Sequence, residues 1–366
     1  MRLKYFFALI VLLHGLIHLM GFIKAFGYGN INQLSTVISK ASGVAWLITA
    51  ILFTIGVLML LIRNDTWPYI LFSTAIISQI LIISTWQDAK FGSIANVVII
   101  LVAIVAIASK NFEKQYTKDV KKHLSETSKE QPDLLIEADI RHLPLPVQKY
   151  LRYCNVLNKP KVKNFKVVFD GQMREKGKDW FIFRSTQYNF LENPTRLFFM
   201  KAKMFGAPVL GYHCYQNVTA SMKIKLLGFF NVVNIKGNEM NQAETVTVFN
   251  DLCLMAPAAL IDKRIEWTAV DNLTAKATFK NGGNKITATL YFNEQGQLVN
   301  FTSDDRYAIA AMKRYRFSTP VKNYAEIGGR NIWTYGEAIW HYPDGEFVYG
   351  KFNLKSIEYN VEKFER

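Results

Sequence analysis

Residues 41–62 read ASGVAWLITAILFTIGVLMLLI, a run of 22 residues with no charged side chain. An α-helix needs about 20 mainly apolar residues to cross the hydrocarbon core of a bilayer. Three further charge-free runs lie near it in the chain, at 5–23, 66–87 and 91–109. Because each run is long enough to cross as a helix, the pattern predicts a bundle of four transmembrane helices within residues 1–110.

Composition separates this bundle from the rest of the chain. The protein has 366 residues, with 44 Lys and Arg against 29 Asp and Glu, and a formal net charge of +15. Residues 1–110 hold only seven of the basic and two of the acidic residues, and a chain of this length suits two domains. We therefore expect a transmembrane domain at 1–110, a charged linker at 111–138 and a second domain at 139–366.

Basic residues near the four runs predict the side of the membrane on which the second domain lies. If all four runs cross, the amino terminus, the loop at Arg63 and everything after Lys110 share one side. That side has eight basic residues near the runs, whereas the other side has three, Lys24, Lys40 and Lys90. Lys and Arg accumulate on the cytoplasmic side of membrane proteins. We therefore expect a multi-pass integral membrane protein whose second domain is cytoplasmic.

The positive charge favours an anionic partner. For a chain with transmembrane helices, the nearest anionic surface is the layer of phospholipid headgroups. No helix-turn-helix, zinc-finger or RNA-binding aromatic motif accompanies the charge, so nucleic acid is not expected as a partner. The lipid bilayer is the expected partner.

Two histidines inside the first run are the only metal candidates. His14 and His18 lie one helical turn apart, a spacing that allows metal or haem ligation. Imidazoles inside a helix bundle also hydrogen-bond to neighbouring helices, and we favour that role. The three cysteines lie far apart without a CxxC motif and are interpreted as small core residues. We expect no metal and no cofactor.

Beyond residue 160 the apolar residues alternate with polar ones, which is the period of β-strands. The runs are 165–169, 180–188, 196–204, 209–215, 274–279 and 286–292. Asn293-Glu-Gln-Gly and Tyr342-Pro-Asp-Gly are typical of hairpin turns, so neighbouring strands should pair antiparallel. Residues 244–261 instead have helical spacing around Pro257. The sequence predicts an α+β domain, mainly a curved antiparallel sheet or incomplete β-barrel (half β-barrel) with covering helices.

Five segments of this domain also resemble a known family. They are LPLPVQKYLRY at 143–153, FNDLCLMAPAALI at 249–261, DDRY at 304–307, YGEAIW at 335–340 and IEYN at 357–360. In this order they are similar to an uncharacterised bacterial family of membrane-anchored domains placed near the lipoprotein-carrier (Lol-type) fold. The resemblance implies an incomplete antiparallel barrel around an apolar cavity that holds acyl chains, in a protein of the bacterial inner (cytoplasmic) membrane. It implies no reaction.

Aromatic residues supply the candidate ligand-binding site. The second domain has more of them than one closed core of this size needs, which favours a cavity for lipid tails. Five large aromatic residues are the candidates for its lining: Trp180, Phe198, Trp267, Trp333 and Trp340. The leading hypothesis is a membrane-anchored protein of lipid or lipoprotein handling, which binds a lipid or an acylated ligand and is not an enzyme.

The first alternative is an enzyme that acts on a membrane-embedded or acylated substrate. Its catalytic candidates are Asp305, Arg306 and Glu337, although a structural ion pair from Asp305 or Glu337 to Arg306 is the simpler interpretation. No GxSxG, HExxH, GxxxxGK or GxGxxG motif accompanies them. A second alternative is a membrane scaffold that binds another protein.

Overall fold

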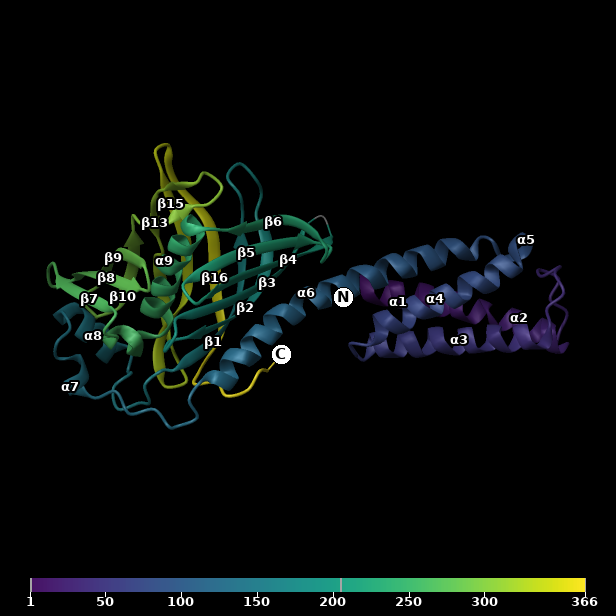
Figure 1. Cartoon of the computed structure of the whole chain (residues 1–366), viewed down its shortest axis with the longest axis horizontal. Helices are drawn as coiled ribbons and strands as arrows, with labels where there is room; N and C mark the ends of the chain where they lie inside the picture. Colours follow the sequence, from purple (N-terminus) through teal and green to yellow (C-terminus); the bar gives the residue numbers. More distant parts are fainter. Residues whose placement is uncertain (1, 205, 366) are drawn as a thin grey trace. The chain divides into compact units, whose positions relative to one another are not determined.

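The computed structural model describes residues 2–204 and 206–365 and divides into two compact units, Met1–Phe112 and Glu113–Arg366 (Figure 1). The first unit is helical. It consists of α1 (Arg2–Ile17), α2 (Leu19–Phe26), α3 (Lys40–Leu61), α4 (Trp67–Ser84), α5 (Trp86–Ala89) and the first part of α6 (Gly92–Glu126). Among the described residues, four helical segments are long and apolar enough to cross a membrane: Leu3–Phe26, Lys40–Leu61, Trp67–Ser84 and Gly92–Glu126. They coincide with the four runs in the sequence.

Close helix packing holds the first unit together. A Cβ atom on Gly56 of α3 would lie 2.2 Å from Leu71 Cδ2 of α4, so only glycine allows this approach of the two helices. Large apolar side chains point away from the bundle, as at Ile80 and Leu101, which are 62% and 58% exposed. The buried positions include polar residues such as Ser78. The bundle is therefore apolar on its outer surface and partly polar inside.

Helix α6 belongs to both units, because it is continuous while the boundary falls after Phe112. Residues 111–126, at the start of the charged segment, are therefore helical. In the second unit, Tyr116 of α6 donates a hydrogen bond to the Thr186 carbonyl at 3.1 Å, and its ring stacks on Phe199 at 5.1 Å. Tyr212 donates to Asp119 at 2.8 Å. The carboxyl-terminal part of α6 thus covers one face of the sheet described next, which we call the outer face.

The second unit is built on one large antiparallel sheet. Its strands are β1 (Asn164–Met173), β2 (Phe181–Phe190), β3 (Thr195–Met204), β4 (Ala207–Gln216), β5 (Thr219–Leu226), β6 (Phe230–Lys236), β7 (Ile265–Ala269), β8 (Thr274–Asn281), β9 (Asn284–Phe292), β10 (Leu298–Ser303), β13 (Arg316–Ser318), β14 (Val321–Ile327), β15 (Arg330–Tyr342) and β16 (Gly345–Tyr359). A separate pair is formed by β11 (Tyr307–Ala308) and β12 (Lys313–Arg314).

The strand order is β6-β5-β4-β3-β2-β1-β16-β15-β13-β10-β9-β8-β7, and β14 pairs with β15. In the described part of the chain β6 and β7 pair with one neighbour each, so the sheet is open at both edges and is not a closed barrel. It is nevertheless strongly curved, because Asn281 at the end of β8 donates a hydrogen bond to the Tyr215 hydroxyl on β4 at 2.8 Å. This confirms the predicted curved antiparallel sheet.

The predicted turns lie where they were expected. Gly296, with φ 82°, lies in the turn from β9 to β10, and Gly345, with φ 124°, begins β16 after the turn from β15. Both positions need the positive φ that glycine adopts at low cost.

Helix α9 (Asn238–Met255) crosses the inner face of the sheet and connects edge strand β6 to edge strand β7 (Figure 1). Pro257 begins the 3₁₀ helix η1 (Pro257–Ile261), which ends α9 because proline cannot continue the helical hydrogen bonds. The last carbonyl groups of α9 accept hydrogen bonds from three aromatic side chains, Tyr150 to Cys253, Trp333 to Leu254 and Tyr359 to Met255. Tyr150 comes from α8 (Leu145–Tyr153), which follows the short α7 (Glu137–Ile140). The end of α9 is thus tied to the sheet.

Aromatic rings fill much of the space between α9 and the sheet. Phe249 of α9 stacks on Phe279 at 5.1 Å and meets the edge of Phe301 at 5.9 Å, and all three side chains are fully buried. Dense packing of this kind stabilises the fold through burial of apolar surface.

Charged residues are also buried beneath α9. Arg196 of β3 is 8% exposed and donates through Nε to Asp251 at 2.7 Å and through Nη1 to Glu244 at 3.1 Å. Gln187 of β2 accepts from Arg196 at 3.0 Å and donates to Asp251 at 2.7 Å. Asn189 donates to Asp251 at 3.3 Å. These five residues, the buried charge cluster, join the second and fourth turns of α9 to β2 and β3.

The two carboxylates of the cluster respond differently to their surroundings. Burial by itself would raise the pKa of Glu244, but the charge of Arg196 and the hydrogen bond with His213 outweigh burial and lower the pKa to about 2. At Asp251 burial is the dominant influence and raises the pKa, against the charge of Arg196. The ionised Glu244 is therefore the carboxylate that Arg196 stabilises most clearly.

Replacing Arg196 should destabilise the second unit strongly. We expect Arg196→Met to lower the free energy of unfolding by about 3–5 kcal/mol, because it leaves buried carboxylates without their cation. Arg184→Met is the matched control, since Arg184 pairs with Asp170 on the surface with its side chain 65% exposed, and such pairs contribute little. Denaturant unfolding of the full chain in detergent measures both, and equal midpoints for the two variants would contradict the prediction.

Acid should weaken the contribution of Glu244. Its folded pKa of about 2 lies below the ordinary value of 4.5, so the stabilisation is complete above pH 4.5 and is lost as the pH falls toward 2. We expect the difference in melting temperature between the natural protein and Glu244→Gln to be largest near neutral pH and to shrink below pH 4.5. A difference that stays constant down to pH 2 would show that Glu244 is not held in the ionised form.

Candidate functional site

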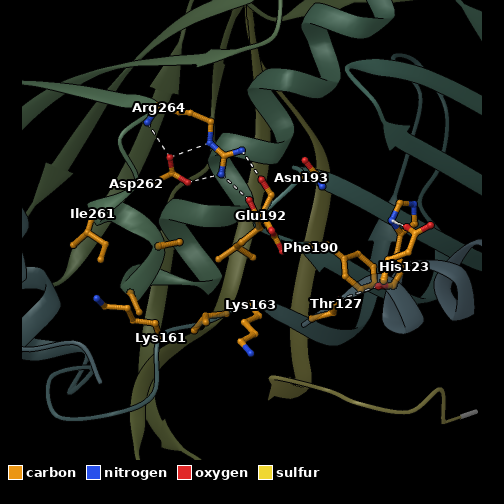
Figure 2. Close-up of a pocket in the computed structure, with 15 residues that line it drawn as sticks. His123, Thr127, Lys161, Lys163, Phe190, Glu192, Asn193, Ile261, Asp262 and Arg264 are labelled. Carbon is orange, nitrogen blue, oxygen red and sulfur yellow. Dashed lines mark hydrogen bonds and ion pairs between the residues drawn. The ribbon is translucent and has the colours of Figure 1, made fainter. Parts of the chain in front are cut away.

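A pocket of about 290 Å³ lies in the second unit, where η1, the turn between β2 and β3, the chain before β1 and the end of α6 meet (Figure 2). This volume is near the lower end of the range for small-molecule sites. The residues around it are His123, Glu126, Thr127, Lys161, Val162, Lys163, Phe190, Leu191, Glu192, Asn193, Ala258, Ala259, Ile261, Asp262 and Arg264.

The lining of the pocket is amphipathic. Apolar side chains come from three separate parts of the chain, with Val162 before β1, Phe190 at the end of β2 and Ile261 at the end of η1. Charged residues of both signs surround them, and they include Lys163 and Glu192. A surface of this kind suits a ligand with an apolar part and a polar part.

One cation of the lining is fixed by the fold. Arg264 donates to both oxygens of Asp262 and to the carbonyl groups of Leu191 at 2.6 Å and Glu192 at 3.0 Å, as Figure 2 shows. Its guanidinium group therefore joins the segment after η1 to the turn between β2 and β3. This contact shapes the pocket wall.

Two lysines of the pocket lining keep N–H donors available for a ligand. Lys161 pairs with Asp139 at 3.2 Å, and Lys163 donates to the carbonyl groups of Ser128, at 3.0 Å, and Glu130. A lysine ammonium group has three N–H donors. Within the described residues, these contacts leave at least one donor on each lysine for a ligand.

The histidine of the pocket has defined partners. His123 Nε2 lies 3.0 Å from the side-chain oxygen of Gln216, and its ring centre lies 5.2 Å from that of Phe190. Its Nδ1 lies 3.4 Å from a carboxylate oxygen of Glu126. These contacts place the imidazole as part of the wall.

The five aromatic candidates lie elsewhere. Phe198 and Trp333 are each 4% exposed in the core, and Trp333 supports the end of α9. Trp267 donates to the Leu260 carbonyl at 3.1 Å and covers η1. Trp180 lies 4.4 Å beneath the guanidinium group of Arg174. Trp340, 8% exposed, packs in the core beside Phe317. The pocket described above is lined by none of these five residues.

Arg306 lies among aromatic rings. Its guanidinium carbon is 4.1 Å from the ring centre of Phe317 and 4.9 Å from that of Trp340, and its Nη1 donates to the Tyr349 hydroxyl at 2.9 Å. Among the described residues neither Asp305 nor Glu337 forms an ion pair with Arg306, so the expected ion pair is wrong. Cation–π contact replaces it, because Arg binds well to aromatic faces.

Asp305 and Glu337, the other catalytic candidates, do not join Arg306. Asp305 accepts hydrogen bonds from the backbone and hydroxyl groups of Thr287, both at 2.7 Å, and pairs with Arg314 at 3.4 Å. Glu337 accepts from the Tyr335 hydroxyl at 2.6 Å. Glu337 is three residues from Trp340 on β15, so its side chain points to the opposite face from the ring that contacts Arg306. The three side chains do not converge on one substrate position.

The histidines of the first unit are bonded to other helices. His14 Nε2 lies 2.9 Å from the side-chain oxygen of Asn96, and His18 Nε2 lies 2.8 Å from the Ser78 hydroxyl. His18 Nδ1 lies 2.9 Å from the carbonyl oxygen of His14. In the part of the chain that the structure describes, no third His, Cys, Asp or Glu joins them. The contacts give both rings hydrogen-bond partners inside the bundle.

Sequence reasoning missed the pocket because its walls come from segments that are far apart in the chain. The one local signal is that lysines at 161 and 163 flank Val162 and that Lys263 and Arg264 follow Ile261 closely. Only the pairing of β1 with β2 and the position of η1 bring these segments together.

The chain is weakly similar to a solved structure. A crystal structure of LolA superfamily protein NE2245 from Nitrosomonas europaea matches with a TM-score of 0.34 and 10% sequence identity, covering 59% of this chain and 94% of that chain. At that TM-score the likeness carries no argument about fold or function. No curated protein matches the chain.

A family comparison covers most of the second unit. The family DUF6544, described as a family of unknown function, matches residues 133–352, which is more than half of the chain. The five segments that resembled an uncharacterised family all lie within this range or next to it. The chain therefore belongs to the family of unknown function DUF6544.

Proposed function

We propose that this protein is anchored in a membrane by its first unit and binds an amphiphile with an acyl chain in the pocket of its second unit. The observation that carries the proposal is the amphipathic lining of the pocket. Val162, Phe190 and Ile261 offer an apolar surface, and Lys161 and Lys163 offer N–H donors beside it.

The surface of the first unit supports a membrane anchor. Its four long helices expose large apolar side chains, and its interior holds the polar contacts of His14, His18, Ser78 and Asn96. A bundle in water would expose the polar groups and bury the apolar ones, whereas hydrocarbon favours the reverse. An even number of crossings and the excess of basic residues on one side support a cytoplasmic second unit in this proposal.

The chemistry of the ligand follows from the lining. An acyl chain would cover the apolar residues, and a carboxylate or phosphate group would accept hydrogen bonds from Lys161 and Lys163. Because Glu192 adds a negative charge nearby, a zwitterionic headgroup also fits the charges. A free fatty acid and a phospholipid share this chemistry, and the experiments below separate them.

Binding is favoured over catalysis by the positions of the reactive groups. Asp305, Arg306 and Glu337 each have structural partners and do not converge. Burial raises the pKa of Cys214 to about 11, so its thiol is not ionised at neutral pH and is a poor nucleophile.

Narrowing the pocket should remove the ligand. We expect native mass spectrometry of the full chain, released from mild detergent, to show a bound amphiphile that is lost in Ile261→Trp, because the indole ring enters the space of the acyl chain. Ile182→Trp is the control, since Ile182 is 71% exposed on β2 outside the pocket, and it should keep the ligand. A natural protein with no bound amphiphile, or one that is equally loaded in both variants, would refute the proposal.

Removing the two donors should identify the head of the ligand. We expect Lys161→Gln with Lys163→Gln to weaken binding of a spin-labelled fatty acid at least as strongly as binding of a spin-labelled phosphatidylethanolamine, as measured by electron paramagnetic resonance in detergent micelles. Lys276→Gln with Lys285→Gln changes two exposed lysines on β8 and β9 and should affect neither probe. The probe that binds more tightly to the natural protein names the ligand class. Unchanged binding of both probes in the first variant would contradict a role for these lysines.

A reporter fused after Arg366 tests the side of the membrane. We expect a cytoplasmic reporter such as a fluorescent protein to be active and a periplasmic reporter such as alkaline phosphatase to be inactive, because four crossings return the chain to the side of its amino terminus. The opposite pair of results would contradict a cytoplasmic second unit.

A further inference from the structure

The hairpin of β5 and β6 exposes a group of apolar side chains at its tip. Phe229, Phe230 and Val232 are 41%, 57% and 62% exposed. They follow Leu227, which occupies the turn between the two strands, and these four residues are called the apolar tip below. Neighbouring large apolar residues that remain exposed together mark an interaction surface.

The turn residue itself is unusual. Leu227 and Gly228 both have positive φ, at 56° and 80°, in the three-residue turn between β5 and β6, and Gly or Asn is the usual residue in that conformation. A leucine pays a steric penalty in this conformation. Val218 in the turn between β4 and β5 also has positive φ, but its side chain packs against Gly282, where a Cβ atom would lie 2.7 Å from Val218 Cγ2. Leu227, by contrast, remains partly exposed. Packing inside the domain therefore does not account for a leucine in this turn, whereas contact with a partner would.

The strands that carry the apolar tip and its neighbours have lysines and no acidic residue. Between Glu192 and Glu239 the sequence has no Asp or Glu, and this stretch contains β3 to β6. Lys203 near the end of β3 is exposed, and Lys225 of β5 pairs with Asn231 beside the tip. The Leu227 backbone N–H donates to the Pro208 carbonyl at 2.8 Å, which joins the tip to β4. The neighbouring turn after β3 adds Met204, 38% exposed.

We propose that the apolar tip docks on the anionic surface of the bilayer. Phenylalanine side chains favour the interface between headgroups and acyl chains, and lysines beside them are attracted by anionic lipids. The same chain carries four helices that are apolar enough to cross that bilayer. The tip is separate from the pocket, so the docking does not depend on what the pocket binds.

Charge decides between this partner and a second copy of the chain. Strand β6 is a sheet edge, and an edge strand can pair with the same strand of another copy. Pairing of this kind would bring β5 and β6, which together carry Lys223, Lys225 and Lys236 and no acidic residue, against the same strands of the second copy, and their like charges oppose it. An anionic lipid surface removes that repulsion.

Site-directed fluorescence tests the docking in the full chain. The three natural cysteines are buried, so a thiol-reactive NBD dye will label a cysteine introduced by Val232→Cys. In vesicles of phosphatidylethanolamine and phosphatidylglycerol that contain spin-labelled phospholipid, we expect a blue shift and a loss of emission from this dye. Replacing phosphatidylglycerol with phosphatidylcholine should reduce that loss, because the lysines then lack an anionic surface.

Val270→Cys supplies the matched control, since Val270 is 51% exposed in the turn between β7 and β8, near the other sheet edge. Its dye should keep its emission. Phe229→Ser with Phe230→Ser, in the Val232→Cys background, should lose the quenching while keeping the melting temperature of the folded chain, because both rings are exposed. Equal emission at 232 and 270 would overturn the proposal, and so would disulfide formation between copies at 232 without quenching by lipid.

Discussion

Arg196 lies between the sheet and α9, and its guanidinium group is bonded at once to Asp251, Glu244 and Gln187. Buried charges of this kind are costly to desolvate, so the geometry of their hydrogen bonds must be maintained. Glu244 and Asp251 are seven residues, or about two turns, apart on α9. Both carboxylates therefore reach Arg196 only when α9 has one orientation about its axis and one position along it. The position of α9 in turn fixes Phe249 against Phe279 and places η1 at the pocket.

This arrangement determines where a ligand can enter. An incomplete barrel exposes an apolar inner face, and here Phe249 and the other apolar side chains of α9 occupy that face. The space that remains lies beyond the end of the helix, where Pro257 turns the chain and Ile261 meets Phe190. The same packing explains why Phe198 and Trp333, which attract attention in the sequence as ligand contacts, lie in the core.

The order of elements was largely predictable, because it depends on local patterns. Charge-free runs predicted the four apolar helices, alternation predicted β1 to β4, β8 and β9, and Pro257 marked the break after α9. The role of the segment after Lys110 was harder to see, since its charged residues obscure Tyr116, Val120 and Leu124, which recur every fourth residue and are buried. Contacts between distant segments escaped prediction altogether. Arg306 has acidic neighbours in sequence, yet Phe317, Trp340 and Tyr349 surround it in space, because strand pairing brings β13, β15 and β16 together.

The central position of β16 has a consequence for synthesis of the protein. This strand is the last of the chain, yet it pairs with β1 on one side and β15 on the other. A nascent chain can form the β1 to β6 meander early, but one hydrogen-bonding edge of β1 stays open until β16 has been synthesised. Contacts over such a sequence distance form slowly, and unpaired edges attract other chains. Chains that end before residue 345 would therefore be left with two unjoined half-sheets, one from β1 to β6 and one that ends at β15.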